Sequence, residues 1–109
     1  MSQSKYRAMW LVAMFDLPVT TRKARKAYAH FRKTLLERGF TMLQNSVYAR
    51  YCTSEEASDV RRAHVRRCLP DDGQVRLMAI TDIQFGKMGV FYGKKCVPAE
   101  PAPSQLTFF

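Results

Sequence analysis

Residues 9–18 read MWLVAMFDLP, and this stretch decides the fold that the rest of the chain can adopt. As far as residue 15 its side chains are apolar on both alternating faces, which is the pattern of a central β-strand buried on two sides. Asp16 interrupts the apolar run, and Pro18 ends the strand because proline has no amide hydrogen for a ladder. The sequence therefore predicts a buried strand with an acidic residue directly after it.

A helix is predicted after this strand, running to about Arg38. Thr20 or Thr21 can cap its first turn, and Gly39 is the expected stop, since glycine tolerates the left-handed conformation that often follows a helix. Apolar residues at helical spacing form its core-facing stripe: Ala24, Ala27, Tyr28, Phe31 and Leu35. The opposite side carries Arg22, Arg25, Lys26 and Lys33, with Lys23 and Arg32 beside it.

A β-hairpin and a second helix follow. Residues 40–42 and 46–52 read as the two arms of the hairpin, with a turn near residues 44–45. Thr53 or Ser54 can cap the second helix. Its inner side is predicted to carry Ala57, Val60, His64 and Cys68, while Arg61, Arg62, Arg66 and Arg67 crowd its C-terminal half.

A turn at residues 70–73 and a fourth strand over residues 74–82 complete the order βαββαβ. This order predicts an α+β, ferredoxin-like domain over residues 1–86, with two helices on one face of an antiparallel sheet. The other face would be open, although the first and last strands are apolar on both sides. A second copy of the chain, packed sheet to sheet as a homodimer, is the simplest cover.

Residues 87–109 are expected to form a C-terminal proline-rich extension. Residues 97–104 read VPAEPAPS, which is typical of a stiff extended linker. The apolar end of the chain, residues 106–109, either docks as a strand on an edge of a partner or frays.

The charge of the chain points to a polyanionic partner. Its 18 Lys and Arg residues against 9 Asp and Glu residues give a formal net charge of +9. Residues 1–39 hold nine basic and two acidic side chains, hence +7, so the positive field is concentrated on the first third of the chain. Phosphate neutralisation with release of counterions favours nucleic acid as the partner, and a bland basic surface is the alternative.

Several classes of protein are excluded by the same sequence. No apolar run approaches the ~20 residues that span a bilayer, and the N-terminal run is too short for a signal sequence, so a reducing cytoplasmic setting is expected. Cys52, Cys68 and Cys96 are odd in number and widely spaced, which supports neither a disulfide framework nor a zinc site and makes buried free thiols the expectation. His30 and His64 have no partner at metal-ligand spacing and read as packing residues.

Asp16 is the one acidic residue in a suggestive place. A carboxylate at a strand end can hold Mg²⁺, which keeps several waters and needs only one or two protein oxygens. One carboxylate per chain makes a poor metal site, but a two-fold axis would bring two together. The alternative is an Asx-type turn ahead of Pro18.

Four segments together carry a family resemblance: FDLP at residues 15–18, GF at 39–40, LQNSVY at 43–48 and RLMAITDIQF at 76–85. In this order and spacing the chain resembles the CRISPR-associated protein two family over about residues 6–93. The strand-end aspartate with the Gln-x-Ser-Val-Tyr segment is the most specific part of the resemblance.

The resemblance implies a ferredoxin-like homodimer that lies between two dimers of the CRISPR integrase and acts in spacer acquisition. Its basic surface, here Arg22, Lys23, Arg25, Lys26, Arg32 and Lys33, would hold duplex DNA. Family members are also described as Mg²⁺-dependent endonucleases on RNA or DNA. Asp16 matches their strand-end aspartate, so the resemblance implies one Mg²⁺ per dimer between the two Asp16 side chains.

A single-stranded RNA-binding module of the same topology, without catalysis, is the alternative function. Such a module reads bases with paired sheet aromatics in a Lys/Arg-Gly-Phe-type strand. Residues 46–52, SVYARYC, lack the glycine and the motif.

Overall fold

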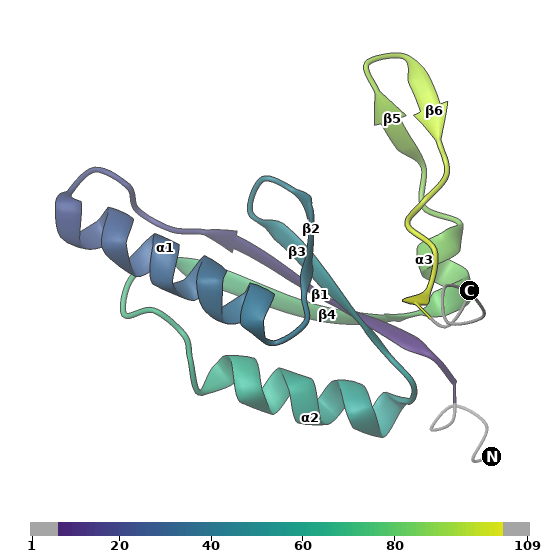
Figure 1. The fold of residues 1–109 in the computed structure, drawn as a ribbon, viewed down its shortest axis with the longest axis horizontal. Coiled ribbons are helices and arrows are strands. Elements are labelled where there is room, and N and C mark those ends of the chain that lie inside the picture. The colour runs from purple at the N-terminus through teal and green to yellow at the C-terminus, as the bar shows by residue number, and fades with distance from the viewer. Residues whose placement is uncertain (1–6, 104–109) are drawn as a thin grey trace.

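A computed structural model describes residues 7–103 and shows two long helices lying together on one side of a sheet (Figure 1). The elements in chain order are β1 (Met9–Asp16), α1 (Arg22–Glu37), β2 (Thr41–Gln44), β3 (Val47–Cys52), α2 (Glu55–Arg66), β4 (Gln74–Thr81), α3 (Asp82–Gly86), β5 (Val90–Tyr92) and β6 (Lys95–Val97). The sheet order β2-β3-β1-β4, with antiparallel pairing throughout, confirms the predicted α+β class with a ferredoxin-like order. Within the described residues, no helix has the length and apolarity needed to cross a membrane.

β1 is the central strand that its sequence predicts. It pairs with β3 on one side and β4 on the other, and every residue from Met9 to Ala13 is buried. The odd-numbered side chains of β1 enter the core beneath the helices, whereas Trp10, Val12 and Met14 belong to a second cluster on the opposite face. Both faces of β1 thus contribute buried residues, which agrees with its apolar residues on both sides.

α1 and α2 begin at side-chain caps and cover one face of the sheet. The Thr21 and Ser54 side chains accept hydrogen bonds from the third helical amide, 3.0 Å away in both cases. α1 is followed by Gly39 at φ +86°, the left-handed conformation that glycine adopts without strain. Phe31 and Leu35 carry the buried side of α1 into the core.

The predicted inner side of α2 is partly wrong. Val60 is 52% exposed, whereas Ser58 and Val65 are buried. The actual inner side is rotated because Val65 is the side chain that reaches the core cluster, and Ser58 stands seven residues before it. The Ser58 hydroxyl is satisfied by donating to the Glu55 carbonyl oxygen at 2.8 Å, so its burial leaves no polar group unpaired.

The helix-free face of the sheet, expected to be open, is partly covered by the chain itself. Phe85 of α3 stacks on Trp10 with ring centroids 4.0 Å apart and an interplanar angle of 8°. The Trp10 Nε1–H donates to an Asp82 carboxylate oxygen at 2.7 Å, and Ala99 packs against the same cluster. This cover occupies the Trp10 end of the face and leaves the Asp16 end without it.

The segment after residue 86 holds a hairpin that was not predicted. β5 and β6 pair around a turn at Gly93 and project away from the sheet (Figure 1). Their three-residue strands are too short to show periodicity in sequence. Phe91 and Tyr92 are 63% and 70% exposed on this hairpin, so its aromatic side chains are not part of the core. The predicted docking of residues 106–109 lies outside the described residues.

Candidate functional site

Asp16 is the last residue of β1 and is exposed. By the alternation of the strand, its side chain shares the helix-free face with Met14, which belongs to the second cluster. Gln74 lies opposite Asp16 in β4, and Arg76 lies opposite Met14. Asp16, Gln74 and Arg76 line one shallow groove with a volume of 200 Å³. An acid, an amide and a cation are thus gathered at one end of the sheet.

The backbone around Asp16 is held by two turns. The Phe15 amide donates to the Ser46 carbonyl oxygen at 3.0 Å, which ties the end of β1 to the β2–β3 turn. Gly73 has φ +93°, and a Cβ at this residue would lie 2.8 Å from the Asp16 carbonyl oxygen. Glycine is required at residue 73 both by its conformation and by this close approach. The carboxylate therefore projects from a fixed position.

The alternative interpretation of Asp16, an Asx-type turn ahead of Pro18, can be compared with the hydrogen bonds of the structure. Within residues 7–103, the side-chain hydrogen bonds include the caps at Thr21, Ser54 and Thr81 but none accepted by the Asp16 carboxylate. The Asp16 side chain is exposed, so its carboxylate can bind a cation or accept a hydrogen bond from a bound molecule. The alternative of an Asx-type turn therefore has no hydrogen bond to support it among the described residues.

Within residues 7–103, Asp16 is the one carboxylate in the groove at this end of the sheet. Among the described residues, no group of three or more His, Cys, Asp or Glu side chains is placed to hold a metal ion. Asp16 supplies one carboxylate, and the amide oxygen of Gln74 across the strand pair is a further oxygen of the kind that Mg²⁺ accepts. These residues fit a magnesium ion that keeps most of its waters, since Mg²⁺ needs only one or two protein oxygens.

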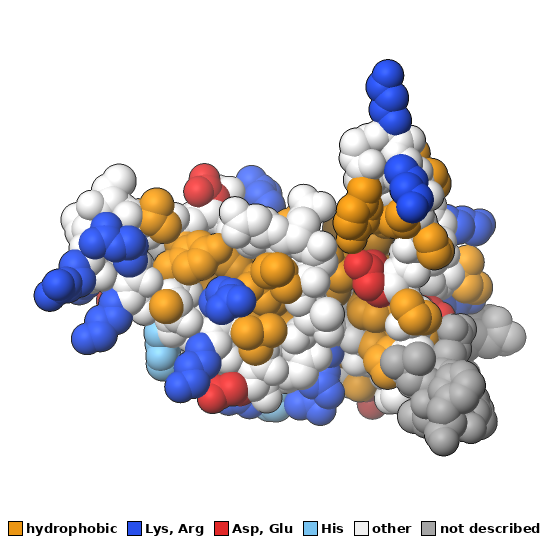
Figure 2. Space-filling view, turned by 45° about the horizontal axis from the view of Figure 1, so that its top comes forward, with side chains coloured by type: hydrophobic (Ala, Val, Ile, Leu, Met, Phe, Trp, Pro, Cys, Tyr) orange, Lys and Arg blue, Asp and Glu red, His pale blue; other side chains and the backbone are white. Residues whose placement is uncertain are grey.

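The predicted basic residues all lie exposed on α1: Arg22, Lys23, Arg25, Lys26, Arg32 and Lys33. Cationic side chains gather at the left end of Figure 2, over the first turns of α1. The first turn of this helix contains no acidic residue. From Arg22 to Lys33 the helix advances about 16 Å, a length that spans several phosphates of a nucleic acid backbone.

The six cations are not equivalent. The Arg32 Nε–H donates to the Tyr48 hydroxyl at 2.8 Å, and Arg25 Nη1 donates to the Val19 carbonyl oxygen at 3.3 Å. Each of these two residues is therefore partly committed to the fold. Arg22, Lys26 and Lys33 have no such bond within residues 7–103 and lie on the outermost side of the helix.

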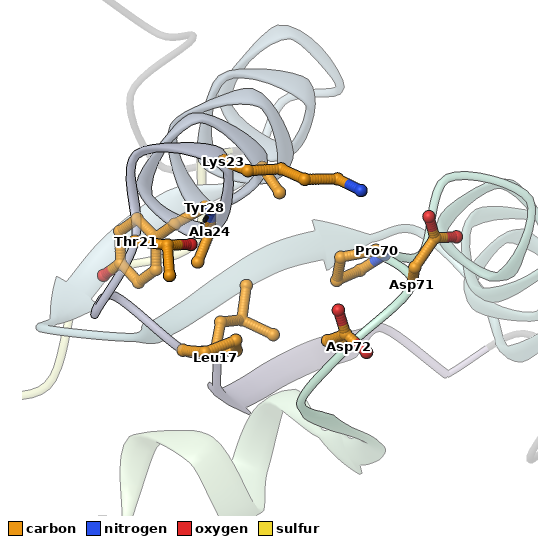
Figure 3. A pocket seen from close by; sticks show the side chains of 10 residues that line it. Leu17, Thr21, Lys23, Ala24, Tyr28, Pro70, Asp71 and Asp72 are labelled. Carbon is orange, nitrogen blue, oxygen red and sulfur yellow. Dashed lines mark hydrogen bonds between the residues drawn. The ribbon is translucent and has the colours of Figure 1, made fainter.

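Lys23 points elsewhere than the rest of the row. It extends over a small pocket between the start of α1 and the 70–72 loop, toward Pro70 and Asp71 (Figure 3). The pocket has a volume of 100 Å³, well below the roughly 300 Å³ of a typical small-molecule site. This pocket is therefore a packing gap at the end of α1, and Lys23 contributes less to the basic row than its sequence position implies.

Gln74 and Arg76 are the site residues that sequence reasoning missed. The signal was present, since the first residues of β4 must lie beside the last residues of an antiparallel β1.

The cysteines also differ from expectation: Cys52 is buried, but Cys96 is exposed on β6.

Comparison with known proteins supports the resemblance seen in the sequence. The family described as CRISPR associated protein Cas2 matches residues 9–88. A protein of Parvibaculum lavamentivorans is 54% identical over 101 residues, which cover 93% of this chain and 100% of the relative. A protein of Flavobacterium psychrophilum is 46% identical, covering 97% of this chain and 92% of its own. A third, from Paracidovorax avenae, is 45% identical, covering 95% and 96%.

All three relatives are named CRISPR-associated endoribonuclease Cas2. The matched region begins with β1 and ends just after α3, so it includes Asp16, Gln74, Arg76 and the whole of α1. With this coverage and identity, the chain belongs to the Cas2 family of CRISPR associated proteins.

Proposed function

We propose that the protein is a homodimeric, Mg²⁺-dependent endonuclease that cleaves RNA, with Asp16 as its catalytic carboxylate. The names of the relatives support an endoribonuclease. The observation that carries the proposal is the placement of Asp16, exposed at the end of a buried strand and sharing a groove with Gln74 and Arg76.

Two copies packed through their helix-free faces would complete the site. Met78 is 44% exposed on this face, and Met14 and Val47 are half-buried, so an apolar area remains that α3 does not cover. Burial of such an area favours association. A two-fold axis near the end of β1 would bring the two Asp16 carboxylates together, and a pair of carboxylates suits one Mg²⁺ per dimer.

The residues of each chain would then share the chemistry. Bound Mg²⁺ supplies polarisation of the phosphate and activation of a water. Asp16 would hold the ion, and Arg76 is placed to bind phosphate oxygens and to stabilise the negative charge that develops as the phosphodiester is attacked. The two turns that fix the end of β1 keep the carboxylate in position, so little reorganisation is needed when the substrate binds.

Asp16→Asn tests this function. The variant keeps the size of the side chain and removes its charge, and Asp59→Asn on the exposed surface of α2 is the matched control. The mass in solution should be that of a dimer, and cleavage of RNA should require Mg²⁺, stop with chelator and be lost only in Asp16→Asn. Cleavage that survives in Asp16→Asn, or a monomeric protein that cleaves, would rule out the two-carboxylate site.

We also propose a scaffold role, in which the dimer binds duplex DNA for the CRISPR integrase through the basic row on α1. The supporting observation is that Arg22, Lys26 and Lys33 are exposed along one side of a helix with no acidic residue in its first turn. Replacing these three residues with glutamine should weaken duplex binding. It should also make the plot of log K against log salt concentration less steep, by ~0.9 for each of up to about three lost phosphate contacts. Unchanged binding would mean that the duplex lies on another surface.

The single-stranded RNA-binding alternative is disfavoured by the sheet aromatics. Trp10 is 4% exposed because Phe85 covers it, and Tyr48 is buried on the helix side. Tyr51 is partly buried against the edge of Trp10. The four-stranded sheet therefore lacks, among the described residues, the pair of accessible rings on which such modules stack bases.

A further inference from the structure

A second group of cations gathers between α1 and α2, away from the basic row. It consists of Arg38 at the end of α1, Arg50 on β3, and Arg61, His64 and Arg67 on α2. All four arginines are close enough to lower the pKa of His64, and no carboxylate acts on it in the opposite direction. We call these five residues the interhelix cluster.

The interhelix cluster is held in place although its charges are not neutralised. Arg50 Nη1 donates to the Arg38 carbonyl oxygen at 2.6 Å, which fixes the guanidinium at the end of α1. The Arg50 Nε and the His64 Nδ1 are buried and have no hydrogen-bond partner among the described residues. Burial, followed by the charge of Arg61, lowers the pKa of Arg50. Like charges gathered in this way repel one another, and an anion would remove the repulsion.

Accessible space adjoins the interhelix cluster at one of its members, Arg67. A groove of 330 Å³ lies between α1 and the segment that follows α2, and its lining includes His30, Phe31, Arg67 and Asp71. A second hollow of 250 Å³ is lined by Ala63, Arg66 and Arg67. Arg67 therefore borders both spaces and is exposed, so an anion can reach it without a change in the fold.

We propose that the interhelix cluster binds a phosphodiester of a nucleic acid backbone, as a second contact surface separate from the basic row on α1. Arginine suits this ligand because its planar fork of donors matches two phosphate oxygens. The site uses the arginines of α2, for which the proposed nuclease and scaffold roles provide no function. It does not depend on cleavage and can be tested with chelator present.

His64 makes this contact sensitive to pH. In the free protein its pKa is lowered, first by desolvation and then by Arg38, Arg67, Arg61 and Arg50. A bound phosphate opposes these arginines and favours the charged imidazole, so binding takes up a proton and the affinity rises as pH falls through the bound-state pKa.

The other titratable groups near the cluster do not reverse this expectation. From β3, the pKa of the Cys52 thiol is raised by burial, so it stays neutral. Asp71, in the turn after α2, is the one carboxylate among the described residues that line the groove. His30 of α1 also borders the groove, and it provides a control for the assignment of the pH effect.

Equilibrium binding of a short labelled DNA duplex, in chelator, tests the proposal. Arg61→Gln combined with Arg67→Gln should weaken binding about tenfold or more and reduce the logarithmic salt slope by about two contacts. Arg22→Gln combined with Lys26→Gln removes the same charge from the basic row and is the comparator. Unchanged affinity and slope in the α2 variant, with the comparator weakened, would overturn the proposal.

Histidine NMR supplies a readout that does not depend on the arginine variants. Addition of the duplex should raise the pKa of one imidazole, and the affected signal should be absent in His64→Gln and retained in His30→Gln. A signal that shifts equally with inorganic phosphate alone, with no further shift from duplex, would assign the site to small phosphates and overturn the nucleic acid assignment. A His64 imidazole whose pKa changes with neither the duplex nor inorganic phosphate would overturn the site itself.

Discussion

Replacing Gly73 with alanine is the sharpest test of how the end of β1 is held. Gly73 has φ +93°, and an added Cβ would lie 2.7 Å from a Leu17 methyl carbon and 2.8 Å from the Asp16 carbonyl oxygen. The conformation alone costs about 1–2 kcal/mol for an alanine. The contact with a backbone oxygen adds about 1–3 kcal/mol, because backbone cannot rotate away as a side chain can. We expect Gly73→Ala to lower the free energy of unfolding by about 2–5 kcal/mol in total.

Two other glycines separate these contributions. Gly93 has φ +64° with no atom within 4 Å of its Cβ position, so Gly93→Ala should cost only the conformational part, about 1–2 kcal/mol. Gly86 lies in α3 with an ordinary φ and equally open space, so Gly86→Ala should be neutral or stabilising by about 1 kcal/mol. Urea unfolding at one fixed protein concentration measures all three, since the proposed dimer would make stability depend on concentration.

The comparison between Gly73 and Gly93 decides whether the contact at Asp16 matters. A Gly73→Ala variant no less stable than Gly93→Ala would refute the claim that the 70–73 turn presses against the end of β1. A variant with the expected loss should also cleave RNA more slowly under conditions where it remains folded, because the Asp16 backbone must shift to admit the methyl group.

Three further outcomes are expected. Phe85→Ala should lower the free energy of unfolding by about 3–5 kcal/mol, because the ring is buried against Trp10. Ile83→Ala, on the exposed side of α3, should change it by less than about 0.5 kcal/mol, and urea unfolding measures both. Thr21→Ala removes the cap of α1 and should cost about 1 kcal/mol in the same assay. Burial raises the pKa of the Cys52 thiol, so the free energy of unfolding should fall as pH rises above the ordinary thiol pKa of about 8.5. In the native protein, a thiol reagent should label the exposed Cys96 well before the buried Cys52.

The long elements were predictable because each carries several independent signals. β1 shows an apolar run with a proline stop, and α1 shows a cap and a glycine end, which the structure confirms. The predicted stripe of α1 is confirmed except at Ala27, which is exposed. α2 was harder, since its inner side includes Ser58 and excludes Val60, and hydropathy alone gives the opposite choice. α3 is too short for a periodic pattern, although the capping box formed by Thr81 and Gln84 marked its start.

The candidate site could be predicted in its position but not in its environment. The strand-end location of Asp16 followed from the break in the apolar run. Its neighbours Gln74 and Arg76 depend on the register between β1 and β4, which strand order alone does not fix. The interhelix cluster was the least predictable, because Arg38, Arg50 and Arg61 meet only after two helices and a strand pack together.

The stack of Phe85 on Trp10 gives the protein an optical reporter. Trp10 is the single tryptophan of the chain. Its indole is covered by the ring of Phe85 and donates one hydrogen bond to Asp82. If α3 lifted from the sheet, the indole would meet water and its emission would move to longer wavelength, while the circular dichroism of α1 and α2 on the opposite face stayed the same. Fluorescence can therefore follow the departure of this small cover separately from global unfolding, and show whether nucleic acid or a second subunit disturbs it.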